Sequence, residues 1–186
     1  MLKIKRILWI IGVLKMVGYN VQVHHSFDSL NKDSFIKTIE RGFGRKLVPH
    51  YLEIANPEYI LAIQSPAIQS PAIQSPAIQS PALDSYLGIA VVESFQSNID
   101  YLDKIAVLPE YQGNGVGKAL FEQLHFSSPN LFWRARTSNP ANEWYGKNSD
   151  FSVQEGELRV YFKNIMAADI NACLNYALTK PKTLSD

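Results

Sequence analysis

Cysteine is nearly absent from this sequence, because Cys173 is the only one among 186 residues. A lone thiol excludes an intramolecular disulfide framework and fits a reducing compartment. Apolar residues recur around it at helical spacing, so we expect Cys173 to be a buried apolar residue of a helix, not a nucleophile. The sequence also lacks histidine–cysteine clusters at metal-ligand spacing and an acidic dyad. We therefore expect no metal site and no glycosidase chemistry.

An excess of charge of one sign is lacking as well. The chain has 18 basic and 17 acidic residues, which gives a formal net charge of +1. Binding to nucleic acid or to an anionic membrane surface requires a broad basic surface. We therefore expect neither as a partner.

Acidic residues are missing before Asp28, where an apolar run over 7–14 is flanked by basic residues. This run is too short to span a bilayer, and no small-residue cleavage site follows it, so a secretory signal is disfavoured. A mitochondrial transit peptide would be basic and acid-poor too, but no serine occurs before Ser26. We expect 1–28 to be a separate segment of uncertain role, either a helix or strand that covers the core or the remnant of a preceding domain. The expected location is cytoplasmic, with the mitochondrial matrix as the alternative.

The remaining residues, 29–186, suit one domain. Apolar residues near helical spacing predict a helix or helix pair over 29–51, capped by Asp33 or Ser34. A short strand is predicted over 59–63. From Ala62 to Pro81 the sequence Ala-Ile-Gln-Ser-Pro occurs four times, and prolines at this spacing remove amide donors, so we expect a surface loop over 62–82.

Strands and helices alternate after the repeats. Two strands separated by a short polar segment predict an antiparallel hairpin, and a glycine-rich loop leads from its second strand into a helix. The expected elements are strands over 86–93 and 101–108, a helix over 118–124, a strand over 131–136, a helical turn at Pro140 behind Asn139, and a strand over 158–162. This order predicts an α/β (α+β) sandwich with a central sheet flanked by helices.

The glycine-rich loop is the most informative motif. It reads Gln112-Gly113-Asn114-Gly115-Val116-Gly117-Lys118, and glycines there let the backbone approach a ligand while free amides at a helix start bind a pyrophosphate. A dinucleotide-binding fingerprint needs a third glycine where Lys118 stands. A P-loop needs a Ser or Thr after the lysine, and Ala119 cannot bind magnesium.

The pattern Gln-x-x-Gly-x-Gly after a strand resembles the pyrophosphate loop of the GNAT acetyltransferases. The resemblance implies a mixed, mostly antiparallel sheet with acetyl-CoA in the cleft where two strands splay. It implies acetyl-CoA as co-substrate and a set of cofactor-binding residues that surrounds the loop: Ala106, Val107, Leu108, Gln112, Gly113, Asn114, Gly115, Val116, Gly117, Lys118, Asn142 and Tyr145.

A second resemblance covers roughly 33–165. Tyr101-Leu102-Asp103-Lys104 and the run over 131–145, which contains Phe-Trp-Arg-x-Arg-x-x-Asn-Pro, look like the acetyltransferase domain of vertebrate-type N-acetylglutamate synthases and the related bacterial synthase-kinases. It implies transfer of acetyl to the α-amino group of L-glutamate, with substrate-binding residues Lys46, Lys104, Arg134, Arg136 and Asn139. The amino-acid kinase domain usually fused ahead is lacking, so we expect neither kinase activity nor arginine control. A separate kinase chain or self-association is a possible partner.

The residues themselves agree with an anionic acceptor. Alternation along a strand would put Lys104 on the face of Leu102 and Ala106, towards substrate, and would place Arg134 and Arg136 on a shared face. Guanidinium groups hold carboxylates with paired hydrogen bonds.

The chemistry expected of such a site is direct attack by a neutral amine on a thioester. A backbone amide near Val107 or Leu108 would meet the oxyanion, and the Tyr145 hydroxyl would protonate the departing thiolate. No general base is dictated by the sequence. A GNAT enzyme for another amine, and a catalytically silent acyl-CoA-binding module, remain alternatives.

Overall fold

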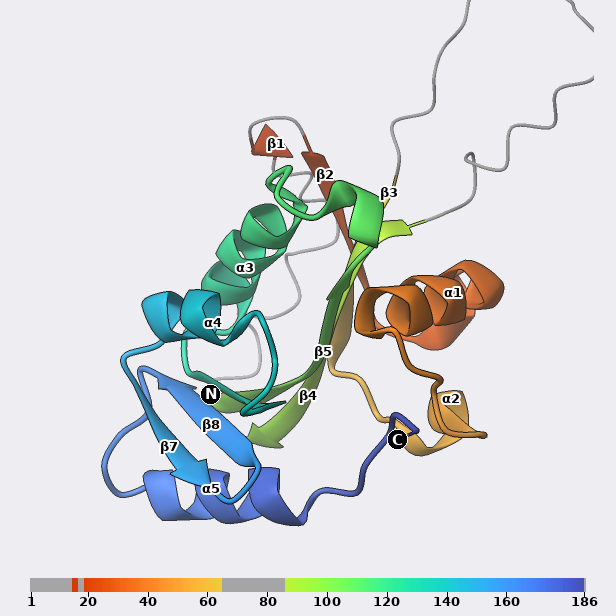
Figure 1. Ribbon diagram of the computed structural model, residues 1–186. Coiled ribbons are helices and arrows are strands. Elements are labelled where there is room, and N and C mark those ends of the chain that lie inside the picture. Colours follow the sequence, from red (N-terminus) through yellow and green to blue (C-terminus); the bar gives the residue numbers. More distant parts are fainter. Residues whose placement is uncertain (1–14, 17–18, 65–85, 186) are drawn as a thin grey trace, which may run out of the picture.

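A computed structural model describes residues 15–16, 19–64 and 86–185. Its strands form one mixed sheet of eight strands within these residues, in the order β1-β2-β3-β4-β5-β6-β8-β7 (Figure 1). The strands are β1 (Lys15–Met16), β2 (Tyr19–His24), β3 (Tyr59–Gln64), β4 (Tyr86–Gln96), β5 (Ile99–Val107), β6 (Leu131–Arg136), β7 (Phe151–Glu155) and β8 (Leu158–Lys163). Only the β5–β6 pair is parallel, so the predicted mostly antiparallel sheet is confirmed.

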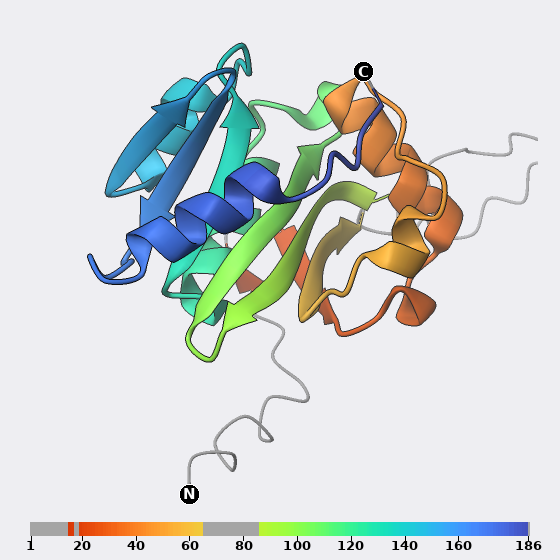
Figure 2. The same cartoon turned by 90° about the horizontal axis from the view of Figure 1, so that it is seen from below.

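Helices cover both faces of the sheet. They are α1 (Lys32–Phe43), α2 (Tyr51–Ile54), α3 (Val116–Ser127), α4 (Asn142–Asn148) and α5 (Ile170–Thr179), with short 3-10 turns at Phe27–Ser29 and Pro109–Tyr111. Figure 2 shows α1 and α5 on the near face of the sheet. The helices α3 and α4 pack on the opposite face, around Phe121, Trp133 and Tyr145. Among the described residues, no helix is long and apolar enough to cross a membrane.

The elements around the glycine loop form where the sequence predicts them. The hairpin of β4 and β5 is antiparallel, β6 spans the predicted residues 131–136, and α3 begins directly after Gly115. Gly88 of β4 lets α3 pack closely, because a Cβ there would lie 2.6 Å from Cγ1 of Val116. The α/β sandwich predicted from the order of elements is therefore confirmed.

The helix or helix pair expected over 29–51 is a pair in the structure. The first helix, α1, stops at Phe43, because Gly44 takes a left-handed conformation with φ of 64°, and α2 starts at Tyr51. The cap of α1 is not Asp33 or Ser34, since the Asn31 side chain accepts the amide of Ser34 at 2.9 Å. Side-chain oxygens commonly accept amides two or three residues ahead in this way.

Both predicted segment boundaries need correction. The strand β2 pairs with β3 from Val21 to His24 inside the main sheet, so a domain starting at residue 29 would omit a sheet strand. The strand β3 continues to Gln64, which moves the first residues of the first repeat from the expected loop into the sheet. Residues 65–85, with the rest of the repeats, lie outside the described part of the chain.

Two further features concern the C-terminal third. The edge strand β7 was not predicted, because it has only two apolar residues, Phe151 and Val153, and an alternation this short is a weak strand signal. Cys173 is fully buried in α5, as expected, and burial raises the pKa of its thiol to about 11. Met166, an apolar residue seven positions before Cys173, precedes the helix and is 72% exposed.

Candidate functional site

A large cleft opens where β5 and β6 diverge. Their parallel pairing ends at Leu102 and Trp133, after which β5 pairs only with β4, and β6 only with β8. The cleft has a volume of about 1290 Å³ and runs from the glycine loop to the turn between β7 and β8. The expected splay of two strands is therefore present.

The glycine loop forms one end of the cleft. Gly113 and Gly115 have φ of 80° and 86°, the region that glycine alone adopts without strain. The first hydrogen bond of α3 runs from the amide of Ala119 to the carbonyl of Gly115, so the amides of residues 116–118 precede the helical ladder. Open space surrounds the loop glycines, since a Cβ at Gly113 would meet no atom within 4 Å. Unpaired amides beside open space suit a pyrophosphate.

Tertiary contacts hold this loop in place. The hydroxyl of Tyr19 in β2 donates to the carbonyl of Asn114 at 3.0 Å, and Gln112 Nε2 donates to the carbonyl of Val107 at 3.2 Å. The contact of Tyr19 was not predicted, because it joins residues 95 positions apart.

One backbone amide of β5 faces the opening. The amide of Leu108 donates to the carbonyl of Leu87 at 2.9 Å, so it is already used within the β4–β5 ladder. Polar groups of successive residues alternate between the two sides of a strand, and the amide of Val107 therefore points away from β4. Of the two amides expected to meet an oxyanion, the geometry favours Val107.

Tyr145 lines the cleft from α4. Its ring packs against Trp133 and Phe121, and its hydroxyl has no hydrogen-bond partner among the described residues. Burial raises the pKa of this phenol above its usual value, and the charge of Tyr161 adds to the effect. The hydroxyl thus stays protonated at neutral pH and is able to give a proton to a leaving group.

Lys104 is placed differently from the expectation. Its partner in β4 is Val91, whereas Val92 pairs with Leu102, so Asp103 is the extra residue of a β-bulge. The bulge breaks the simple alternation: Leu102 packs under α3, while Lys104 faces Tyr51 of α2, with Nζ 5.1 Å from the ring centre.

The ammonium of Lys104 is already neutralised. Its Nζ lies 2.7 Å from Oδ2 of Asp103, and the two side chains are only 5% and 3% exposed. Oδ2 of Asp103 also accepts the hydroxyl of Tyr51 at 2.8 Å. Burial lowers the pKa of Lys104, and Asp103 opposes this shift. The lysine lines the cleft, but its charge is shared with Asp103.

The guanidinium of Arg134 is hydrogen-bonded to main-chain carbonyls at the end of α5. Its Nη1 donates to the carbonyls of Ala177 and Lys180, and its Nη2 donates to the carbonyl of Pro181 at 3.0 Å. Cations stabilise helix C-termini, where carbonyls lack partners. The prediction of a carboxylate-binding arginine is therefore corrected to one that secures the end of α5.

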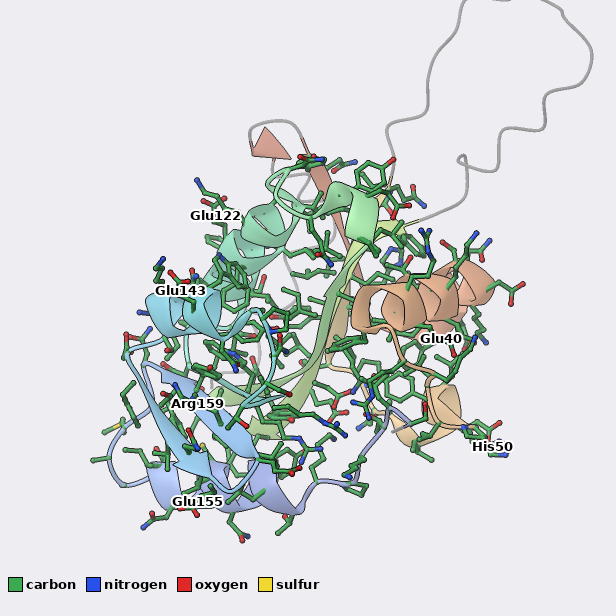
Figure 3. All side chains as sticks on the ribbon, viewed as in Figure 1. Glu40, His50, Glu122, Glu143, Glu155 and Arg159 are labelled. Carbon is green, nitrogen blue, oxygen red and sulfur yellow. The ribbon has the colours of Figure 1, made fainter. Side chains whose placement is uncertain are left out.

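The side chains of three other predicted residues also have partners within the protein. Lys46 is 79% exposed and pairs at 2.6 Å with Glu40, a residue of α1 (Figure 3). It lies outside the described lining of the cleft. Asn142 donates to the carbonyls of residues 136 and 137, and Asn139 accepts the amide of residue 141. The side chains of Asn139 and Asn142 thus stabilise the turn into α4, although Asn139 also lines the cleft.

The described lining contains most of the predicted cofactor residues. These are Ala106, Val107, Gln112, Gly113, Gly115, Gly117, Lys118 and Tyr145. The side chains of Leu108 and Val116 are buried in the core, and Asn114 faces Tyr19 through its carbonyl. Only main-chain atoms of Leu108 and Val116 are therefore available to a ligand.

Positive charge dominates the cleft. Seven cationic and three anionic side chains line it within the described residues, a formal excess of four: Arg45, Lys104, Lys118, Arg134, Arg136, Lys180 and Lys182 against Asp103, Glu155 and Glu157. Arg136, at the end of β6, is an exposed cation of this wall. Such a field favours an anionic ligand.

One wall of the cleft could not be predicted from the sequence. Residues 180–184 follow α5 and line the cleft beside Lys104. They contain no motif, and only the fold brings them there. Gly42 of α1 was missed as well, although a Cβ there would lie 2.8 Å from Cβ of Ala106.

Comparisons with known proteins agree with this geometry. The chain is 30% identical over 174 residues to an acetylglutamate kinase of Xanthomonas campestris, which covers 93% of this chain and 37% of that protein. It is 33% identical over 127 residues to the mitochondrial N-acetylglutamate synthase of Mus musculus, covering 68% and 21%. The chain thus spans well under half the length of these curated relatives.

The fold is that of the GNAT acetyltransferases. The PaiA N-acetyltransferase of Thermoplasma acidophilum, solved in complex with coenzyme A, matches with a TM-score of 0.52 at 12% identity, covering 78% of this chain and 99% of that one. A family model described as NAT, N-acetyltransferase, of N-acetylglutamate synthase matches residues 22–177. The co-substrate of this family is acetyl-CoA, in agreement with the glycine loop. Because the match covers most of the chain, the chain belongs to the N-acetyltransferase family of N-acetylglutamate synthase.

Proposed function

We propose that this domain transfers the acetyl group of acetyl-CoA to the α-amino group of L-glutamate. The observation that carries the proposal is a splayed cleft with a pyrophosphate loop at one end and an excess of four positive charges along its walls. Glutamate brings two carboxylates, which match this field. The names of the Xanthomonas and mouse relatives point to the same acceptor chemistry.

Each step of the transfer has a candidate group in the chain. The loop amides bind the pyrophosphate, and the cationic wall orients the acceptor so that its neutral amine faces the thioester. As the new C–N bond forms, the amide of Val107 stabilises the negative charge on the thioester oxygen. The C–S bond then breaks, and the Tyr145 hydroxyl gives its proton to the thiolate. Water carries away the proton that the amine loses.

The acceptor is tested with acetyl-CoA and a panel of proteinogenic amino acids, with released CoA measured as free thiol. We expect L-glutamate to give the highest kcat/KM, because its two carboxylates pair with two cationic positions. Aspartate is the matched control, since it has the same charge with one methylene fewer. If aspartate, lysine or a histone peptide were clearly better, the glutamate assignment would fall.

The domain suits this assay, since its only cysteine, Cys173, is buried with a pKa raised to about 11. The native protein thus contributes little thiolate to the signal. Tight binding of acetyl-CoA without turnover of any amine would favour the alternative of an acyl-CoA-binding regulatory module.

The partners and the compartment follow from the same proposal. One curated relative is named an acetylglutamate kinase, so we propose an amino-acid kinase, or a second copy of this domain, as the partner. We propose the cytoplasm as the compartment, with the mitochondrial matrix, named for the mouse relative, as the alternative.

A further inference from the structure

The last described residues form a strap across the acceptor end of the cleft. The strap is the segment Lys180–Ser185, which leaves α5 and runs in extended form to the end of α1 (Figure 2). Pairing with the segment after α1 secures its far end: the amide of Val48 donates to the carbonyl of Thr183 at 3.1 Å, and the amide of Ser185 donates to that of Lys46 at 2.8 Å. The strap is therefore a fixed wall.

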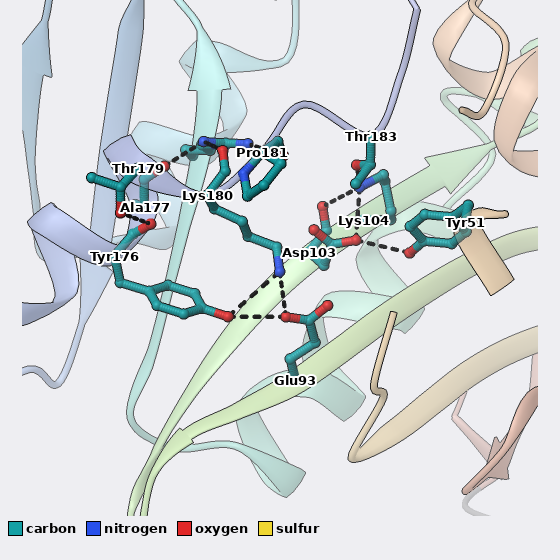
Figure 4. Close-up of polar contacts among 11 residues, drawn as sticks. Tyr51, Glu93, Asp103, Lys104, Tyr176, Ala177, Thr179, Lys180, Pro181 and Thr183 are labelled. Carbon is teal, nitrogen blue, oxygen red and sulfur yellow. Dashed lines mark hydrogen bonds and ion pairs between the residues drawn. The ribbon is translucent and has the colours of Figure 1, made fainter. Parts of the chain in front are cut away.

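A buried ion pair secures the near end. Nζ of Lys180 lies 2.6 Å from Oε2 of Glu93 in β4, and the two side chains are 15% and 9% exposed. Burial pulls the pKa of Lys180 down, but its hydrogen bond to Glu93 and the nearby carboxylates raise it above the usual value, so the lysine stays charged. Arg134 adds hydrogen bonds to the carbonyls of Lys180 and Pro181. Figure 4 shows these contacts together.

Between these anchors, Thr183 reaches the ammonium of Lys104. Nζ of Lys104 donates to Oγ1 of Thr183 at 2.6 Å, and its other hydrogen bonds, at 2.7 and 3.3 Å, both go to Asp103 (Figure 4). Among the described residues, Thr183 is thus the only hydrogen-bond partner of the Lys104 ammonium other than Asp103, its neighbour in β5. Without it, the ammonium would keep only its hydrogen bonds to Asp103 and its contact with the Tyr51 ring.

The hydroxyl of Thr183 has a second capacity. A hydroxyl accepts through its lone pairs and donates through its proton. Since Thr183 accepts from Lys104, its own proton remains to be given to an oxygen in the cleft, which both residues line. A carboxylate placed there would accept from the hydroxyl, while the ammonium beside it, whose three protons are already donated, would contribute its positive charge.

We infer that Thr183 is a positioning residue for the acceptor, which holds the Lys104 ammonium at the wall of the cleft and shares with it the binding of an acceptor carboxylate. This inference rests on the proposed function. It makes the strap part of the acceptor pocket and leaves the pyrophosphate loop, at the other end of the cleft, unaffected. Loss of the Thr183 hydroxyl should therefore weaken the binding of glutamate and leave the binding of acetyl-CoA unchanged.

The test compares Thr183→Val, which keeps the shape of the side chain, with Thr183→Ser, which keeps the hydroxyl. We expect Thr183→Val to raise the KM for glutamate about tenfold, the range of one hydrogen bond to a charged group. The kcat and the KM for acetyl-CoA should stay within about twofold. Thr183→Ser should restore most of the glutamate KM.

Thr179→Val is the matched control. Its hydroxyl donates to the carbonyl of Asn175 at 2.8 Å within α5, outside the described lining of the cleft. This change should leave both KM values unaltered. An unchanged glutamate KM in Thr183→Val, or equal losses for both substrates together with a lowered Tm, would overturn the inference.

Failure of the proposed function gives a different result. If no amino acid serves as acceptor for the native domain, the contact between Thr183 and Lys104 is tested by chemical acylation. A small anhydride is added, and the acylation rate of Lys104 is measured by mass spectrometry relative to that of Lys118, which is 75% exposed. If the ammonium withdraws to the buried Asp103 when Thr183 is removed, Lys104 is acylated more slowly in Thr183→Val than in the native protein, and this result supports the positioning of Lys104 by the strap. Equal or faster acylation overturns it.

Discussion

Gly117→Val should abolish measurable binding of acetyl-CoA, with a loss of at least about a hundredfold, or roughly 2.7 kcal/mol. Gly117 lies in the first turn of α3 and lines the cleft. A Cβ there would meet only Cγ2 of Val107, at 3.7 Å, so the protein itself accommodates a side chain. The added methyl groups would instead fill the space through which a pyrophosphate approaches the amides. Titration calorimetry measures the loss.

The choice of glycine makes this test specific. Gly115→Val would add backbone strain, because Gly115 has φ of 86°. Gly146→Val is the matched control, since Gly146 is helical, a Cβ there would meet no atom within 4 Å, and it lies outside the described lining of the cleft. Its affinity for acetyl-CoA should stay within a few-fold of the native value. If Gly117→Val bound acetyl-CoA normally, the loop would not be the pyrophosphate site.

The part of the site that sequence predicted well depends on local chemistry. The loop from Gln112 to Lys118 lies between a strand and a helix in the chain, and Gly113 and Gly115 have positive φ values, whereas Gly117 already belongs to the helix. The strands on either side are also local features, because alternation and β-branched residues identify β4 and β5 without knowledge of the rest of the fold.

The acceptor side was predicted less well, because its contacts join residues far apart in the chain. Arg134 meets carbonyls 43 to 47 residues later, and Lys104 meets Thr183 across 79 residues. A one-residue bulge at Asp103 also turns Lys104 to a different face from the one that strict alternation predicts. Neither the long-range contacts nor the bulge can be predicted from the neighbouring residues in the sequence.

One physical rule accounts for most of these differences. A sequence shows which residues are cationic, but it does not show which of them pair with carbonyls and carboxylates of the folded chain itself. A cation that is buried must be paired, as Lys104 is with Asp103 and Lys180 with Glu93. Cations on the exposed rim of the cleft stay in contact with water, so they exchange a contact within the protein for a substrate carboxylate at a smaller cost, and these are better candidates for binding an acceptor.

Arg136→Ala should therefore damage the use of glutamate and spare acetyl-CoA. Arg136 is an exposed residue at the end of β6 and lines the cleft, so its removal disturbs the core little. Loss of a guanidinium that pairs with a carboxylate typically costs about 1.5–3 kcal/mol, or roughly 10- to 150-fold in kcat/KM for glutamate. The affinity for acetyl-CoA should change no more than a few-fold, because main-chain amides of another segment hold the pyrophosphate.

Arg159→Ala is the matched control for this change. Arg159 lies on the neighbouring strand β8, where its Nη2 donates to Gln154 at 2.8 Å, and it is not part of the described lining of the cleft (Figure 3). Lys104→Ala is a poorer test, because it would leave the carboxylate of Asp103, 3% exposed, without its cation and so destabilise the fold. If Arg136→Ala weakened acetyl-CoA binding and left the glutamate KM unchanged, the arginine would belong to the cofactor site, and the acceptor would have to be held by the strap and its neighbours.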